Sequence, residues 1–154
     1  MNSGKWLLEV VWWVVTVVLM VLVLLTIYTK LGADYPFYKS NMAFIAIAVT
    51  AIRYMFLLKH HWVSSSKWIK ALFMVIPIPI FFYLIGAFYE FQSYSDEQGL
   101  SAMMTDLPYK AQLRLSKYIH VEMVFFFAAA MISTVLMPFR MLISIWREIN
   151  KGTH

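Results

Sequence analysis

The sequence predicts an all-α integral membrane protein, a four-helix transmembrane bundle with an amphipathic helical extension at its C-terminus. Four long apolar runs occupy most of the 154 residues. Each run is about as long as the ~17–25 residues that a helix needs to cross the hydrocarbon core of a bilayer. Hydrophobic residues make up 62% of the chain, and charged residues make up only 14%. The charges gather at the ends of the apolar runs, where they orient a membrane protein.

A single transmembrane domain accounts for the whole chain, 1–154, and leaves no room for a separate soluble domain. Its four spans are expected at about 6–28, 42–58, 68–89 and 118–138. Residues 90–117 form the expected outer loop, and residues 139–154 form an amphipathic cytoplasmic tail. The bilayer is therefore the first partner that the sequence predicts.

The net charge of +5 would be compatible with nucleic-acid binding in a soluble domain. Here the basic residues do not form a stripe on one folded face, so we expect no nucleic-acid partner. Eight of the 13 Lys and Arg residues lie on the side that holds both termini, and five lie on the other side. Because cytoplasmic loops carry the excess of Lys and Arg, this distribution predicts a cell (inner) membrane protein with both termini in the cytoplasm.

Several kinds of chemistry are missing from the sequence. The chain has no cysteine, which excludes disulfides, thiolate metal ligands and thiol catalysis. With five glycines, it contains neither a phosphate-binding loop nor a nucleophile elbow. His120 and Glu122 are two residues apart on a predicted helix, so their side chains are separated by about 200° around the helix axis. They are therefore not expected to bind the same ion. We expect no catalytic residue, no metal and no cofactor.

Polar residues near the outer end of the bundle are the first candidates for function. Glu90 ends the third expected span, and His120 and Glu122 lie just inside the fourth. A carboxylate within a span usually faces protein and is a functional-site hypothesis. Glu122 is therefore a candidate proton carrier, with Tyr118 one turn earlier as a hydrogen-bond donor. The alternative is that Glu122 stays hydrated about a turn below the membrane surface.

Arg53 is a further candidate, in the second span. Ala43, Ala46, Thr50 and Arg53 recur at spacings of three and four, so they share one helix face. This face is either a polar path or a packing surface of small residues whose arginine extends to the cytoplasmic interface. We favour the packing interpretation. Pairing between Arg53 and Glu122 is not expected, because they lie toward opposite membrane surfaces.

Three prolines predict helix interruptions. Pro77 and Pro79 predict a kink in the third span, because proline lacks an N–H and clashes with the preceding turn. The kink either lines a cavity or only shapes the helix, and we favour shape. Pro138 is expected to interrupt the fourth helix. Beyond it, polar residues from Arg140 to Lys151 share one face and apolar residues from Leu142 to Ile149 lie opposite, a pattern suited to a lipid surface or a partner helix.

The long polar segment before the fourth span carries two local signals. Ser95 to Gln98 fits a capping box that would open a short helix, although Gly99 alternatively predicts a turn there. Asp106 to Pro108 predicts a helix start, with an acidic cap and a proline in the first turn. The fourth helix is therefore expected to begin outside the membrane and to run inward without a break.

These features favour a non-enzymatic protein, a small subunit or accessory of a larger membrane complex. The outer loop and the apolar stripe of the tail offer surfaces to other membrane subunits or to a second copy. The alternative is a small oligomeric transporter or channel that uses Glu122, Arg53 and the proline kink. An enzyme acting on a lipid or quinone is the third hypothesis. Its one supporting feature is an aromatic group made of Trp68, Phe81, Phe82 and Tyr83.

Overall fold

The computed structural model describes residues 3–57 and 67–150. Within these ranges the regular elements are helices, and four of them are long and apolar enough to cross a membrane. The chain is a four-helix transmembrane bundle, which confirms the predicted fold class. Residue 58 of the expected second span and residues 151–154 of the expected tail lie outside the described residues.

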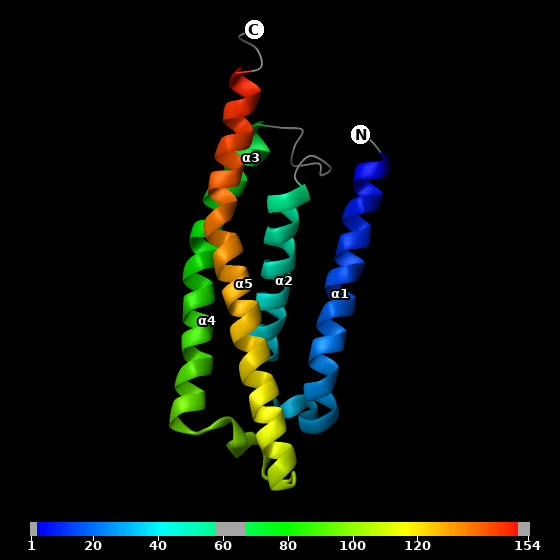
Figure 1. Cartoon of the computed structure of the whole chain (residues 1–154), viewed down its shortest axis with the longest axis vertical. Helices are drawn as coiled ribbons and strands as arrows, with labels where there is room; N and C mark the ends of the chain where they lie inside the picture. Colours follow the sequence, from blue (N-terminus) through cyan, green and yellow to red (C-terminus); the bar gives the residue numbers. More distant parts are fainter. Residues whose placement is uncertain (1–2, 58–66, 151–154) are drawn as a thin grey trace.

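The first two long helices are antiparallel neighbours. α1 (Ser3–Leu31) and α2 (Tyr38–Leu57) are joined by the short 3-10 helix η1 (Gly32–Asp34), and both are visible side by side in Figure 1. Gly32 has a φ of 61°, a left-handed conformation that glycine adopts at little cost. α1 packs chiefly against α2 and leaves most of its large apolar side chains exposed. That exposure is favourable in lipid, where apolar side chains need no cover.

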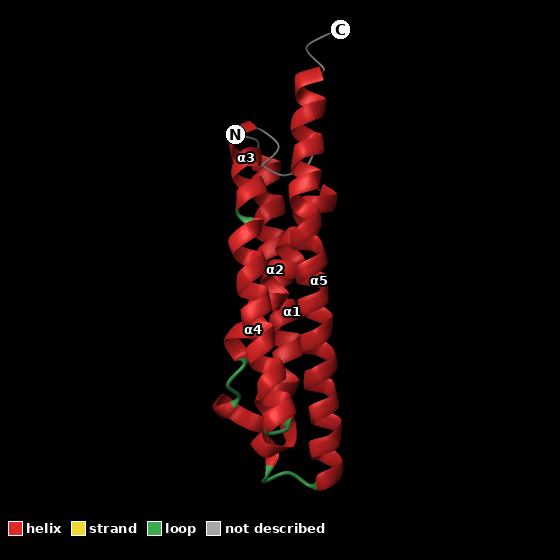
Figure 2. Ribbon diagram, turned by 90° about the vertical axis from the view of Figure 1, so that its left-hand side faces the viewer, coloured by secondary structure: helices red, strands yellow, loops and turns green. Residues whose placement is uncertain are grey.

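The third membrane crossing is divided into two helices. α3 (Lys67–Val75) ends one residue before α4 (Pro77–Glu97) begins, and Figure 2 shows the break as a short loop segment. The break lies at Ile76, directly before Pro77 and close to Pro79. Since neither proline can donate a backbone hydrogen bond, the helical ladder is interrupted at this point.

The segment 90–117, which we expected to be an outer loop, is mostly helical. α4 continues to Glu97, and a turn at Gly99, with a φ of 75°, leads into the 3-10 helix η4 (Leu100–Met104). The turn interpretation of Gly99 is therefore correct, and the capping-box interpretation is wrong. Apolar side chains in this segment pack into the core and so hold it against the bundle: Phe91, Leu100 and Met104.

The last helix, α5 (Tyr109–Asn150), contains 42 residues and is about 63 Å long at ~1.5 Å per residue. It begins directly after Pro108, so the predicted start lies close to the real one, but the proline precedes the helix and is not in its first turn. The helix exceeds the ~30 Å hydrocarbon core by far. Pro138 lies inside this continuous helix, so the predicted interruption at Pro138 is wrong. One missing N–H removes a single helical bond, and membrane helices tolerate this when neighbouring helices support them.

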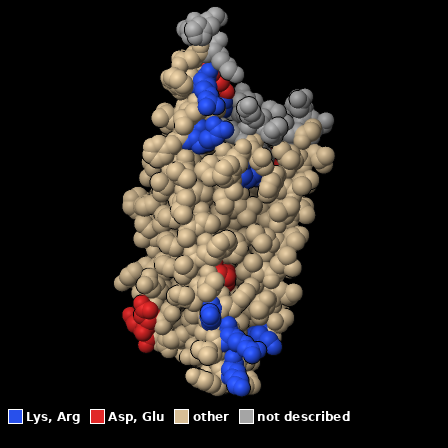
Figure 3. All heavy atoms as spheres, in the orientation of Figure 1, with Lys and Arg blue, Asp and Glu red and all other residues tan. Residues whose placement is uncertain are grey.

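α5 organises the bundle, because it packs against α2, α3 and α4 and carries much of the apolar core. The stacked rings of Phe88 on α4 and Phe127 on α5, with centroids 4.0 Å apart, join two of these helices. Charged side chains on the face shown in Figure 3 gather near the two ends, and the wide zone between them is almost uncharged. This distribution is the one that a membrane-spanning protein requires.

Candidate functional site

A buried ion pair joins α1 to α2 near the end of the bundle where α1 begins. The Nη2 atom of Arg53 lies 3.0 Å from Oε2 of Glu9, and the two side chains are 2% and 7% exposed. The hydroxyl of Tyr54 lies 3.5 Å from each carboxylate oxygen of Glu9. The guanidinium carbon of Arg53 lies 4.6 Å from the ring centroid of Tyr54 and 5.7 Å from that of Trp13. We call these four residues the Glu9–Arg53 cluster.

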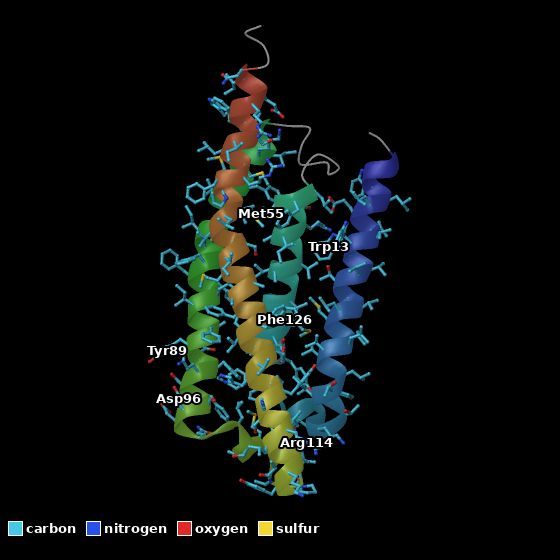
Figure 4. All side chains as sticks on the ribbon, in the orientation of Figure 1. Trp13, Met55, Tyr89, Asp96, Arg114 and Phe126 are labelled. Atoms are coloured by element: carbon cyan, nitrogen blue, oxygen red, sulfur yellow. The ribbon has the colours of Figure 1, made fainter. Side chains whose placement is uncertain are left out.

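The expectation that Arg53 extends to the cytoplasmic interface is wrong. Glu9 reaches Arg53 from the neighbouring antiparallel helix, so the two opposite charges lie together inside the bundle. Figure 4 shows Trp13 of the same cluster at the level where α1 faces α2. The sequence carried a usable signal, because it placed Glu9 and Arg53 on the same side of the membrane in consecutive spans.

A second buried polar group lies where α2 meets α5. The Nδ2 of Asn41 donates a hydrogen bond to Oε1 of Glu122. Asn41 is fully buried and Glu122 is 7% exposed, so the expectation that Glu122 stays hydrated is wrong. Tyr35, from the turn before α2, is buried beside the pair. We call Glu122, Asn41 and Tyr35 the Glu122 cluster.

The Glu122 cluster differs from the Glu9–Arg53 cluster in lacking a cation. Within residues 3–57 and 67–150, no Lys or Arg side chain makes an ion pair with Glu122. Its Oε2 atom and the Oδ1 atom of Asn41 are buried without a hydrogen-bond partner in the same ranges. Burial raises the pKa of the Tyr35 hydroxyl, and the side chain of Asn41 partly offsets this rise.

Tyr118 is not the partner of Glu122 that we expected. Its hydroxyl donates to the backbone oxygen of Val23 at 2.9 Å and so ties α5 to α1. Helical side chains lean toward the N-terminus of their helix, so Tyr118 points away from Glu122, which follows it. Sequence reasoning missed Asn41, which lies one residue before the expected start of the second span. The signal that could have identified Asn41 is an amide side chain on the same side of the membrane as an acid within a span.

Glu90 and His120 do not join Glu122. Figure 4 shows Tyr89 and Asp96 on the outer side of α4, and Glu90 beside Tyr89 is exposed. His120 is also exposed, with its ring centroid 6.2 Å from that of Phe91, at a cleft between α4, η4 and α5. In the part of the chain that the structure describes, no three His, Cys, Asp or Glu side chains gather as metal ligands would.

The C-terminal part of α5 turns its polar side toward the bundle. Lys70 of α3, which is 1% exposed, forms an ion pair with Glu148. The Nε of Arg140 donates to the backbone oxygen of Met55 at 2.9 Å. Large apolar side chains on the other side are exposed: Leu142, Trp146 and Ile149. This segment therefore continues the axis of α5 (Figure 1), rather than lying flat on the lipid surface as we considered.

Among the residues that the structure describes, two apolar grooves open between the helices. One, of about 590 Å³, lies between α1 and α2 beside Val21, Tyr28 and Met42. The other, of about 300 Å³, lies among α1 to α5 beside Trp13 and Thr134. The aromatic residues proposed for an enzyme do not gather into a pocket, because three of the four are exposed: Trp68, Phe82 and Tyr83.

The Glu9–Arg53 and Glu122 clusters thus contain four of the eight buried polar or charged residues in the described part of the chain. One is neutralised by an ion pair, and the other pairs an acid with an amide. No protein-family model matches the chain, and comparisons with curated proteins and with solved structures find no match. The function is therefore argued from the geometry of the bundle.

Proposed function

We propose that the protein is a small non-enzymatic subunit or accessory of a larger membrane complex. The observation that carries this proposal is an apolar layer between the two polar clusters. Asn41 and Arg53 lie about 18 Å apart along α2, at ~1.5 Å per residue. The side chains that α2 buries between them are apolar: Phe44, Ile45, Ala48 and Ala51.

The facing surface of α5 continues this apolar layer. Met123 and Ala130 are buried there, and the ring of Phe127 lies 5.7 Å from that of Phe44. Two polar side chains are buried beyond Ala130. The hydroxyl of Ser133 donates to the carbonyl of Ala129 in its own helix at 2.6 Å, and the hydroxyl of Thr134 has no partner among the described residues. An ion path needs water or polar groups along its length. The apolar layer therefore argues against an ion path through the bundle and favours a role in binding partner subunits.

The projecting end of α5 is the surface that we assign to a partner subunit. Leu142, Trp146 and Ile149 are spaced by four and three residues, so they share one face, and all three are exposed. Their opposite side is held by Lys70 and by the backbone of α2, which fixes the direction of the exposed stripe. A fixed apolar stripe with an aromatic anchor suits a second membrane helix.

Trp146→Ala is expected to release the partner. Truncating an aromatic anchor costs about 2 kcal/mol or more, which is roughly a 30-fold loss of affinity. The measurement is native mass spectrometry of the full chain, purified from its own membranes in mild detergent. The wild type should carry a different polypeptide in fixed stoichiometry, and the variant should not.

Trp6→Ala is the matched control, since Trp6 is an exposed tryptophan on α1 near the same end of the bundle. It should keep the companion. A wild type that runs only as a homo-oligomer with a water-filled centre would contradict the subunit proposal and favour transport.

We also propose that the protein lies in the cell (inner) membrane with both termini in the cytoplasm. Arg53 and Lys70 are paired inside the bundle, so this orientation rests on six flanking basic residues against five at the other end. Because the chain has no cysteine, introduced cysteines report the sides directly. In intact cells, a membrane-impermeant maleimide should label Thr105→Cys and spare Arg147→Cys, since both side chains are exposed and neither belongs to the apolar stripe. The reverse pattern would invert the topology.

A small oligomeric transporter or channel is the second candidate, favoured by the buried Glu122 with its unpartnered Oε2. A carboxylate inside a span is a common proton carrier. In such a transporter the apolar layer would separate Arg53 from Glu122, so the two residues would not be in contact. In vesicles loaded with a pH-sensitive dye, proton flux that Glu122→Gln abolishes without changing assembly would support transport over the subunit role.

A further inference from the structure

Besides the hydroxyl of Tyr35, two buried atoms of the Glu122 cluster lack hydrogen bonds. They are Oε2 of Glu122 and Oδ1 of Asn41, and both belong to side chains that are more than nine-tenths buried. The other polar atom of each side chain has a hydrogen bond, because Nδ2 of Asn41 donates to Oε1 of Glu122. Buried polar atoms in folded proteins are nearly always paired, so these two require an explanation.

Protonation of Glu122 supplies the missing bond. An ionised carboxylate only accepts hydrogen bonds, and the carbonyl oxygen of an amide also only accepts, so Oε2 and Oδ1 cannot pair in that state. A protonated carboxyl group donates, and its O–H then pairs with Oδ1 of Asn41. The acid and the amide thereby form two reciprocal hydrogen bonds, and every polar atom of the pair is satisfied.

We propose that Glu122 and Asn41 form a proton-binding site inside the bundle, in which the carboxyl group of Glu122 carries the proton. The proposal is independent of whether the protein is a subunit or a transporter. Glu9 provides the contrast within the same fold. It meets the cation Arg53, whereas Glu122 meets an amide and becomes neutral by binding a proton.

The groups around Glu122 agree with a neutral carboxyl. α2 presents Asn41, and the turn before α2 presents Tyr35, whose phenol is uncharged when protonated. On α5 itself, Tyr118 is bound to Val23, and His120 is exposed. Two charged residues on the neighbouring helices are also exposed: Lys39 of α2 and Glu90 of α4.

The site joins two helices, so its proton affects their packing. Asn41 belongs to α2 and Glu122 to α5, and these two helices share the most extensive interface of the described bundle. Loss of the proton would leave a buried negative charge against an amide oxygen. α2 and α5 would then separate at this end, or water would enter between them.

Infrared spectroscopy of the full chain in phospholipid vesicles tests the site. The carbonyl band of a neutral carboxylic acid should be present at neutral pH, lost in Glu122→Gln, and kept in the matched variant Glu9→Gln. Exchanging sodium for potassium should leave the band unchanged. A band that appears only on acidification to the range of ordinary glutamates would overturn the proposal, and so would a band that sodium removes, which would indicate an alkali-cation site.

Asn41→Ala provides a second measurement that does not require Glu122→Gln to fold. This variant keeps Glu122 but removes both hydrogen bonds to it. If the pair is reciprocal, the acid band should persist and shift to higher frequency, because its carbonyl no longer accepts a bond from the amide. A band of unchanged frequency would show that Asn41 does not hold the proton-bearing group.

Discussion

Replacing Arg53 by alanine is expected to destabilise the bundle by about 3–5 kcal/mol, the usual effect of breaking a buried ion pair on one side. The cost arises from Glu9, whose carboxylate would remain buried without its cation. Equilibrium unfolding in mixed micelles of mild and denaturing detergent measures the loss. Arg114→Ala is the control, since Arg114 is an exposed arginine near the start of α5 (Figure 4) and should change the free energy of unfolding by less than about 0.5 kcal/mol.

The double variant Glu9→Leu with Arg53→Met separates pairing from packing. Exchanging both charges for apolar side chains of similar volume removes the desolvation cost together with the attraction, and such exchanges are often neutral or stabilising. The double variant should therefore be at least as stable as the wild type, within about 1 kcal/mol. If it is as unstable as Arg53→Ala, the Glu9–Arg53 cluster contributes something other than mutual neutralisation.

Replacing Glu148 by alanine is expected to cost about 1–3 kcal/mol, because the ammonium group of Lys70 would stay buried without its acceptor. The effect should be local to α3 and the end of α5. Limited proteolysis should therefore cut the last turns of α5 faster in the variant.

Arg147→Ala is the matched control for Glu148→Ala. It changes the adjacent residue of the same helix, but Arg147 is exposed. Cleavage of α5 in this control should match the wild type. Equal protection of α5 in Glu148→Ala would mean that the apolar contacts of α3 alone hold the end of the helix.

The two buried glutamates show how neighbours decide the role of one residue type. Glu9 faces an arginine and stabilises the contact of α1 with α2. Glu122 faces an amide, at the contact of α2 with α5. An acid that lacks a buried cation must bind a proton, bind an ion or meet water. This difference makes the Glu122 cluster the place where the bundle can respond to its surroundings.

Several errors of sequence analysis have one origin. The expected spans begin and end with the apolar runs. Helices continue beyond these runs wherever backbone hydrogen bonds can form and the side chains can pack against the bundle. α4 therefore extends to Glu97, and α5 continues through Pro138 to Asn150. Asn41 was overlooked for the same reason, since it falls just before the apolar run and yet inside α2.

The sequence by itself determined the membrane as the solvent, the number of crossings and the placement of both chain ends on one side. The lengths of the apolar runs and the positions of the charges decide these properties. Each property depends on the transfer of single helices into lipid and not on the neighbours of each helix. The tertiary structure decided which polar groups meet: Arg53 with Glu9, Asn41 with Glu122, and Lys70 with Glu148. Such pairs depend on the relative depth and rotation of two helices, which packing of the whole bundle sets and no single helix encodes.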